Sequence, residues 1–187
     1  MGFAIAKAAQ VAGARVTLVA GPVSLATPAG VTRIDVESAS DMLAAVQRVT
    51  PSADVFIACA AVADWTPVTP SQEKIKKDGS GEVPILRFAE TVDILATVAA
   101  TERAKQGALY CVGFAAESHD LARHAQAKRE KKGVPLLVGN IGPDTFGQDH
   151  NTLLLVTPNG VESLPHGPKQ ALAHTLVARV ASAIGSC

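Results

Sequence analysis

The chain has 187 residues, which is enough for one domain, or one domain with a small lobe, around a sizeable core. Its 17 basic and 17 acidic residues give a formal net charge of zero, so the chain as a whole is not built to bind a polyanion such as a nucleic acid. No apolar run reaches membrane-spanning length and no signal-peptide pattern is present, so we expect no membrane partner.

Helical and extended patterns alternate along the chain. Helices are expected over residues 4–12, 39–49, 92–101, 119–132 and 168–185. Strands are expected over residues 15–19, 32–36, 54–59, 83–88, 108–114 and 136–139, with a hairpin of strands 152–157 and 161–164. This order predicts an α/β fold of Rossmann-like type, with a mostly parallel sheet, helices on both faces and a small C-terminal hairpin.

Several local signals mark the ends of these elements. Ser38 with Asp41 forms a capping-box pattern at the start of the second helix. Thr91 and Ser118 are the expected caps of the next two helices. Pro168 is expected to open the last helix.

The stretch from Val55 to Asp64 is the most informative part of the sequence. A mostly apolar strand, of the kind covered on both faces, ends in small residues and is followed at once by a carboxylate. Small side chains let a ligand approach the backbone closely. A lysine cluster follows on a long loop, at Lys74, Lys76 and Lys77. Since ligands of open α/β sheets bind beyond the carboxyl ends of the strands, we expect a site for a phosphorylated ligand here.

These sequence motifs resemble those of the phosphopantothenoylcysteine synthetase domain of the bacterial bifunctional coenzyme A biosynthesis protein. The matching motifs occur in the same order as in that family and extend over nearly the whole chain. The resemblance rests on five segments: Met1–Ala6, Val19–Val23, Ala60–Asp64 with Glu73–Lys77, Val112–Glu117, and the Lys128 and Lys132 pair. It implies one ligase domain over residues 1–187.

The resemblance also implies roles for individual residues. Lys74 would be catalytic, contacting the nucleotide and stabilising negative charge during the reaction. Ala60 and Ala61 would touch phosphopantothenate. The nucleotide-binding residues would be Ala58, Cys59, Ala60, Asp64, Lys74, Val92, Asp93, Ile94, Leu95, Phe114, Lys128 and Lys132. In the segment before Asp93 this chain has Glu90, Thr91 and Val92 where the family usually has Lys-Asn-Pro.

Each of these residues also has an ordinary structural interpretation. A loop lysine such as Lys74 is often only solvated, and an aspartate after a strand, such as Asp64, often forms a turn. Lys128 and Lys132 share one helix face, where cations near a helix C-terminus contribute about 0.3–1 kcal/mol in any protein. Phe114 and the alanines could simply be packing residues.

The cysteines and histidines point to no metal site. Cys59, Cys111 and Cys187 lack metal-ligand spacing and are expected to be reduced thiols in a cytoplasmic protein, with the first two acting as small apolar residues. The five histidines form no ligand cluster.

The reaction that the resemblance implies is the CTP-dependent ligation of 4′-phosphopantothenate to L-cysteine through an acyl-cytidylate, with Mg²⁺ as cofactor. A homodimer is expected, together with fusion to an upstream flavin-dependent decarboxylase domain. Two alternatives stay open: a nicotinamide-dependent Rossmann-type oxidoreductase and a non-catalytic fragment. No Gly-x-Gly-x-x-Gly motif after a strand and no Tyr-x-x-x-Lys pair support the oxidoreductase.

The beginning of the chain departs from the family pattern. A doubly wound domain normally opens on a strand and a Gly-rich turn, whereas this sequence opens on a helix at Met1. We expect that the missing strand would pair inside the sheet, and that a chain with about thirty more upstream residues would be more stable and more active.

Overall fold

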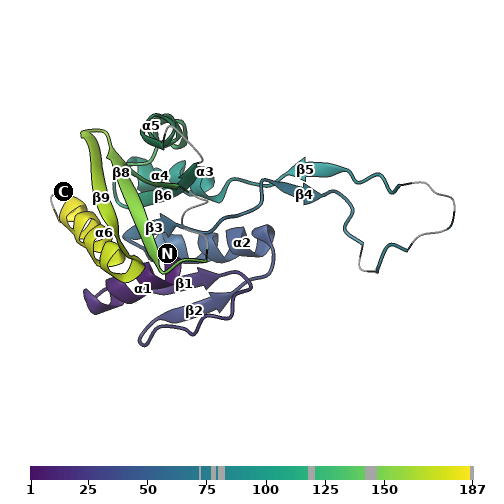
Figure 1. Cartoon of the computed structure of the whole chain (residues 1–187), viewed down its shortest axis with the longest axis horizontal. Helices are drawn as coiled ribbons and strands as arrows, with labels where there is room; N and C mark the ends of the chain where they lie inside the picture. Colours follow the sequence, from purple (N-terminus) through teal and green to yellow (C-terminus); the bar gives the residue numbers. More distant parts are fainter. Residues whose placement is uncertain (72, 77–78, 80–82, 118–120, 142–146, 186–187) are drawn as a thin grey trace.

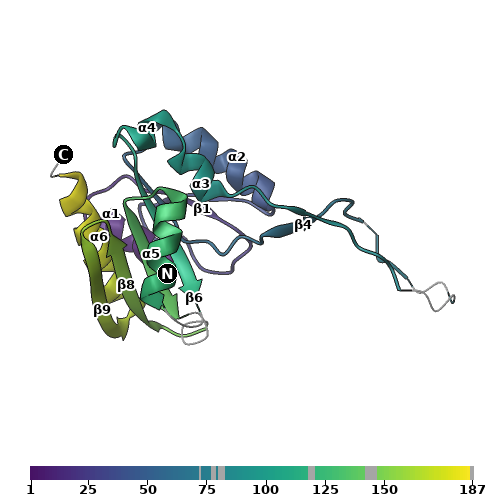
Figure 2. The same ribbon diagram turned by 90° about the horizontal axis from the view of Figure 1, so that it is seen from above.

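The computed structural model shows a three-layer α/β body from which a long arm projects (Figures 1 and 2). It describes residues 1–71, 73–76, 79, 83–117, 121–141 and 147–185. The helices are α1 (Gly2–Val11), α2 (Ala39–Val49), α3 (Ile94–Ala99), α4 (Glu102–Lys105), α5 (Leu121–Lys132) and α6 (Lys169–Ile184), with a 3₁₀ turn at Thr50–Ser52. The strands are β1 (Thr17–Ala20), β2 (Thr32–Asp35), β3 (Val55–Ala58), β4 (Trp65–Pro67), β5 (Phe88–Glu90), β6 (Tyr110–Glu117), β7 (Leu136–Ile141), β8 (His150–Thr157) and β9 (Gly160–Pro168).

The strands form three sheets among the described residues. The main sheet has the order β3-β6-β7-β8-β9, while β1 pairs with β2 and β4 pairs with β5. The β3, β6 and β7 pairings are parallel, as is that of β1 with β2. The β7-β8 and β8-β9 pairings are antiparallel. The α/β prediction is therefore confirmed, but a mostly parallel sheet is only partly matched, because the C-terminal hairpin joins the main sheet through β8.

Helices cover both faces of the main sheet, as predicted. On one face α1 and α6 pack through Ile5, Ala8, Leu172 and Leu176 against inward residues of β6, β7 and β8. On the other face α2, α3 and α5 pack through another set: Val46, Ile94, Val98 and Ala125. Alternate residues of one strand serve the two cores, since Cys111 points to the second core and Val112 to the first.

The strand predicted over residues 54–59 is an edge strand and not a fully covered one. All four residues of β3 are half-buried, because β3 pairs with β6 alone among the described residues. β1 likewise pairs only with β2 in the described part of the chain. The expectation that a further strand belongs inside the sheet stays a prediction.

The arm consists of β4, β5 and the described residues between them, and it extends away from the body in both views (Figures 1 and 2). The strand predicted over residues 83–88 is wrong in position. Residues 83–87 form no strand, although the Arg87 carbonyl accepts a hydrogen bond of 3.0 Å from the Val68 N–H. The β4-β5 ladder starts at Phe88, which lies opposite Pro67. The apolar pattern there indicated a strand, but away from the body it has no sheet face to pack on.

Two helix predictions also need correction. The helix predicted over residues 92–101 is the shorter α3, and Asp93 caps it in place of Thr91: the Asp93 side chain accepts a hydrogen bond from the Ala96 N–H. A separate short helix, α4, follows after Thr101. The predicted cap Ser118 lies outside the described residues. The Ser38–Asp41 capping box forms as predicted, with both reciprocal hydrogen bonds present.

Candidate functional site

The first group of predicted residues meets where β3 ends beside the middle of β6. Ala58, the last residue of β3, pairs with Gly113 of β6, so Phe114 lies one residue further along the neighbouring strand. Ala58, Cys59 and Phe114 are half-buried, whereas Ala60 is exposed. Parallel pairing therefore brings together the small-residue strand end and the predicted aromatic neighbour, as the site prediction requires.

The N-terminus of α1 lies beside the same strand end. A Cβ placed on Gly2 would be 4.0 Å from the Cβ of Cys59. No side chain among the described residues caps this helix. Its Gly2 N–H faces the Cys59 sulfur, so only the following N–H groups of the first turn could meet an oxygen-rich ligand. No site was predicted from the sequence for this helix, although Met1–Ala6 is one of the segments that carry the family resemblance.

Burial raises the pKa of the Cys59 thiol. This effect outweighs the positive charge of the amino-terminal group, the hydrogen bond from the Gly2 N–H and the Lys169 ammonium at the start of α6, each of which lowers the pKa. The thiol is therefore neutral at physiological pH and serves as a small apolar surface. Lys169 adds positive charge near the strand end, and sequence reasoning missed it because a lone lysine after the hairpin carries no motif.

The second group of predicted residues lies where the arm leaves the body. The Thr91 N–H donates to the Asp64 carbonyl at 2.8 Å, which closes the base of the arm beside β4 and β5. Asp64 and Val92 are both exposed there. The Thr91 hydroxyl is buried and has no hydrogen-bond partner among the described residues, and such a group is costly to leave unpaired. The arm base thus combines an exposed carboxylate, that of Asp64, with a buried hydroxyl that has no partner among the described residues.

Packing of α3 on β6 connects the two groups. Leu95, in the predicted nucleotide segment, packs on Gly113: a Cβ there would lie 2.6 Å from Leu95 Cδ2. Ile94 is buried in the second core, so the side chains of Ile94 and Leu95 hold the segment in place rather than face a ligand. Any contact from these two residues to a nucleotide has to come from their backbone.

Asp93 and Lys132 form an ion pair that joins α3 to α5. The Lys132 side chain is only 20% exposed. Two residues that were predicted separately as nucleotide contacts are therefore neighbours in the structure. The sequence could not show this, because the pairing depends on how the two helices pack.

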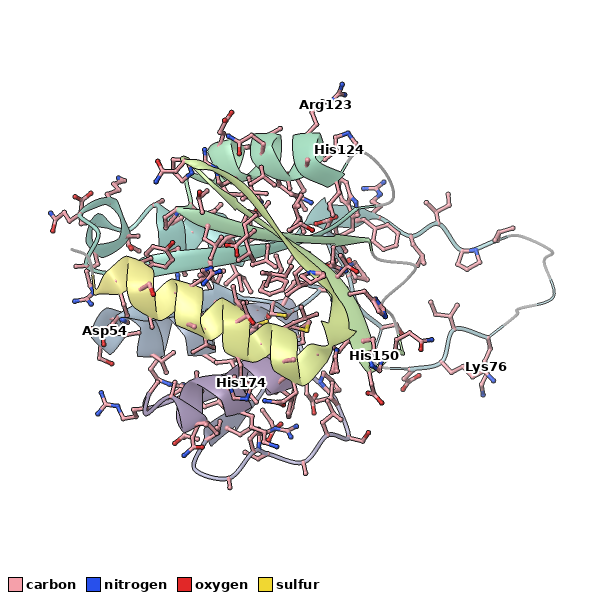
Figure 3. All side chains as sticks on the ribbon, turned by 60° about the vertical axis from the view of Figure 1, so that its left-hand side comes forward. Asp54, Lys76, Arg123, His124, His150 and His174 are labelled. Atoms are coloured by element: carbon pink, nitrogen blue, oxygen red, sulfur yellow. The ribbon has the colours of Figure 1, made fainter. Side chains whose placement is uncertain are left out.

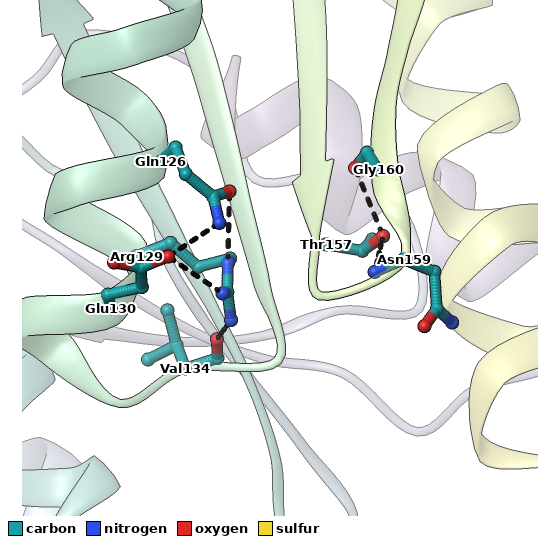
Figure 4. A network of polar contacts seen from close by, with 7 residues as sticks. All are labelled: Gln126, Arg129, Glu130, Val134, Thr157, Asn159 and Gly160. Atoms are coloured by element: carbon teal, nitrogen blue, oxygen red, sulfur yellow. Dashed lines mark hydrogen bonds and ion pairs between the residues drawn. The ribbon is translucent and has the colours of Figure 1, made fainter.

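The other basic residues of α5 differ in what they do. Arg129 donates to the Gln126 side chain at 3.4 Å and to the Val134 carbonyl at 3.3 Å, and it pairs with Glu130 (Figure 4). Arg129 thus fastens the helix to the turn that follows it. Lys128 is exposed on the helix surface. The predicted pair Lys128 and Lys132 is therefore split between an exposed and a partly buried cation.

Lys74 is not beside the other predicted residues. It lies in the arm, between β4 and β5, and is exposed. Lys76, two residues further on, lies far out along the arm (Figure 3). The remaining member of the cluster, Lys77, lies outside the described residues.

A hollow of about 330 Å³ lies elsewhere, at the amino ends of β6 and β7 near the β8-β9 turn. Its cation, Arg179, is held by Glu162 at 2.7 and 2.9 Å, which leaves it poorly placed to receive a phosphate. The turn itself is closed by Thr157, whose hydroxyl donates to the Gly160 carbonyl at 3.2 Å (Figure 4). This hollow is distinct from the predicted site.

Residues that could hold a metal do not cluster in the part of the chain that the structure describes: no group of three or more His, Cys, Asp or Glu side chains is suitably placed. Among the described helices, none is long and apolar enough to cross a membrane.

The three-layer α/β body, with the parallel strands β3, β6 and β7 covered by helices on both faces, has the architecture of Rossmann-like domains. The chain belongs to the family of the DNA/pantothenate metabolism flavoprotein C-terminal domain, which matches residues 1–184.

Relatives and solved structures agree with this assignment. The chain is 42% identical over 180 residues to the coenzyme A biosynthesis bifunctional protein CoaBC of Vibrio cholerae, covering 95% of this chain and 44% of that protein. A crystal structure of the C-terminal domain of CoaBC matches with a TM-score of 0.80 and 31% identity, covering all of this chain and 83% of that one. A complex of Cab2 with phosphopantothenate-cysteine shares the fold, with a TM-score of 0.64, 15% identity and coverage of 84% and 55%. The chain spans about half the length of the curated relatives it matches.

Proposed function

We propose that this chain is the domain of a coenzyme A biosynthesis enzyme that ligates 4′-phosphopantothenate to L-cysteine at the expense of CTP. The observation that supports the proposal is the grouping of several predicted residues in a family-matched fold: Ala58 at the end of β3 beside Phe114 of β6, Asp64 at the arm base, and the ion pair of Asp93 with Lys132. The relatives named CoaBC and the Cab2 complex supply the substrate class.

The chemistry follows from the weakness of a carboxylate as an acylating agent. A carboxylate oxygen of phosphopantothenate attacks the α-phosphorus of CTP, forming the acyl-cytidylate and releasing pyrophosphate. The cysteine amine then attacks the acyl carbon, loses a proton and displaces CMP, leaving an amide. Negative charge grows on the phosphate in the first step, so cations and N–H groups that are already in place stabilise the transition state.

Residues of the chain have separate tasks in this scheme. We infer that Lys132 and Lys128 bind the nucleotide phosphates, and that Ala58, Cys59 and Ala60 read the nucleotide through their backbone. Ala60 and Ala61 leave room for phosphopantothenate at the strand end. Lys74 stabilises the charge that develops at the reacting phosphate.

Mg²⁺ enters this proposal together with the triphosphate. Protein sites commonly hold Mg²⁺ through substrate phosphates and one or two carboxylates. We propose that Asp64, which is exposed at the arm base, would be one such carboxylate. When bound, the ion neutralises phosphate charge.

We further propose that the arm joins two copies of the chain. Large apolar side chains on it are exposed, with Ile85 at 91% and Val83 at 83%. The others are Trp65, Val68, Ile75, Leu86 and Phe88. A two-stranded ribbon of three-residue strands is marginal alone, and contiguous exposed apolar surface marks an interaction site. A second arm of the same composition would cover this surface.

This arrangement explains the position of Lys74. An arm that extends to a second copy carries Lys74 towards the partner's strand ends. Mixing two inactive variants, Lys74→Gln and Lys132→Gln, should then restore about a quarter of wild-type activity, because half of the randomised dimers have one intact site of two. No recovery after subunit exchange would show that Lys74 acts within its own chain.

Dimer formation itself has a simple test. Ile85→Lys should reduce the mass measured by light scattering from dimer to monomer. Val11→Lys is the matched control, since Val11 is also exposed, at 63%, but lies at the end of α1 in the body. Equal masses for the two variants would contradict the arm as the interface.

The relatives' bifunctional name fits a flavin-dependent decarboxylase domain on the same polypeptide, and we propose that this domain is the second enzymatic partner. It would consume the ligase product. Cys59 and Cys111 are free, as expected for a cytoplasmic enzyme.

Nucleotide choice tests the proposal. CTP with Mg²⁺ should raise the melting temperature more than ATP at equal concentration, because binding to the folded state alone stabilises it. A larger shift with ATP, or a shift with NADH only, would remove the cytidylate mechanism and favour a nicotinamide enzyme.

A further inference from the structure

The ion pair between Asp93 and Lys132 differs from the ordinary surface pairs of this chain. The Lys132 side chain is 20% exposed and that of Asp93 is 42% exposed. In the pair Lys105–Glu102 the corresponding values are 59% and 77%. Fully exposed pairs contribute little and exchange readily with water, whereas a partly buried pair is held more firmly.

Asp93 cannot easily turn away from Lys132, because its second oxygen is occupied. Oδ1 accepts a hydrogen bond of 2.9 Å from the Ala96 N–H, and Oδ2 faces the Lys132 ammonium. The Asp93 carbonyl in turn accepts from the Thr97 N–H at 2.9 Å and from the Thr97 hydroxyl at 2.7 Å. The carboxylate is thus fixed by the first turn of α3.

Without Asp93, the Lys132 side chain could adopt several other positions. It is the last residue of α5, where the free carbonyls of the helix end attract a cation. A lysine side chain also loses considerable rotamer entropy when it is held in one place. The anchored carboxylate on α3 directs the ammonium towards the segment from Val92 to Leu95, which closes one side of the site.

We propose that Asp93 is a positioning residue: it holds the Lys132 ammonium at the entrance to α3, ready for the phosphates of the nucleotide. This inference rests on the proposed function, because it takes Lys132 as a phosphate ligand. The positioning role and the net charge of the site predict opposite effects of losing Asp93 on anion affinity. Removing a negative charge near an anion site should strengthen anion binding, whereas loss of a positioning residue should weaken it.

The test uses Asp93→Asn, because asparagine caps helices as well as aspartate but carries no charge. Binding of CTP with Mg²⁺ is measured by calorimetry on wild type, Asp93→Asn, Lys132→Gln and the double variant. Asp93→Asn should weaken binding about fivefold, the order expected for one partly buried ion pair. The double variant should bind no more weakly than Lys132→Gln alone, since Asp93 acts only through the lysine. Asp93→Ser, which also keeps the cap, serves if the asparagine variant folds poorly.

Glu162→Gln is the matched control, because it removes an ion pair with Arg179 away from the site. It should change CTP affinity by less than about twofold. Additive losses in the double variant would mean that Asp93 acts independently of Lys132 and would overturn the inference, as would unchanged or tighter binding by Asp93→Asn. If wild type itself does not bind CTP, the proposed function fails and the inference fails with it.

Discussion

Gly113→Ala tests whether the nucleotide segment is held by close packing on the sheet. A Cβ at this position would lie 2.6 Å from Leu95 Cδ2 and 2.7 Å from Leu137 Cδ1. Each atom would have to retreat by about 1 Å to reach the ~3.5–4.0 Å of ordinary carbon contact. Leu137 is fully buried and cannot move outward, so the strain falls on Leu95 and α3.

Overpacking of this kind destabilises by about 1–3 kcal/mol. For a chain of this length a loss of about 2 kcal/mol lowers the melting temperature by about 4–8 °C. The same displacement should weaken CTP binding, because Leu95 lies in the segment that closes the site. Thermal unfolding by circular dichroism and calorimetric titration with CTP measure the two effects.

Gly167→Ala is the control. Gly167 lies in β9, and the nearest atom to an added Cβ is the Pro165 carbonyl oxygen at 3.8 Å, which is ordinary contact. Its effect on the free energy of unfolding should stay within about 0.5 kcal/mol. Equal stabilities for the two variants would refute the packing argument at Gly113.

Three further predictions concern a loop lysine, the decrease of folding stability at acidic pH, and the thiols. Lys74→Gln should leave the melting temperature nearly unchanged, since the side chain is exposed, but sharply reduce amide formation; near-normal turnover would return Lys74 to a solvated loop residue. Hydrogen bonds from Ser38 lower the pKa of Asp41 below 3.8, and the Arg179 partner lowers the pKa of Glu162 below 4.5. Their stabilisation is complete above these ordinary values and is lost as pH falls through the lowered ones, so urea unfolding should show stability declining below about pH 4.5. Ser38→Ala should flatten that decline, and an unchanged slope would contradict the assignment. Burial raises the pKa of Cys111 to about 11, so alkylation at neutral pH followed by mass spectrometry should label it only after unfolding.

Local signals in the sequence predicted the elements that local chemistry determines. The capping box at Ser38 and the hairpin around Asn159 each depend on neighbouring residues alone, and both formed as expected. The alternation of elements gave helices on both faces of the sheet. The prediction of a strand at residues 83–88 was wrong because an apolar pattern does not show whether a neighbouring strand is present to pair with it.

Long-range geometry lay beyond the sequence. Parallel pairing of β3 with β6 brings Ala58 to Phe114 as the fold prediction implied. The contact of Asp93 with Lys132, and the remote position of Lys74 on the arm, depend instead on helix packing and on the path of the arm. The family resemblance identified these residues as site candidates but did not show which of them are in contact with one another.

The most direct test of the central claim is the product balance of the reaction, measured on the full chain encoded by the gene. Phosphopantothenate, cysteine, CTP and Mg²⁺ should yield CMP and pyrophosphate in amounts equal to the sum of phosphopantothenoylcysteine and its decarboxylated product, with CMP released only after cysteine is added and pyrophosphate released before it. Amide formation without CTP, or release of CDP and orthophosphate in place of CMP and pyrophosphate, would contradict an acyl-cytidylate ligase.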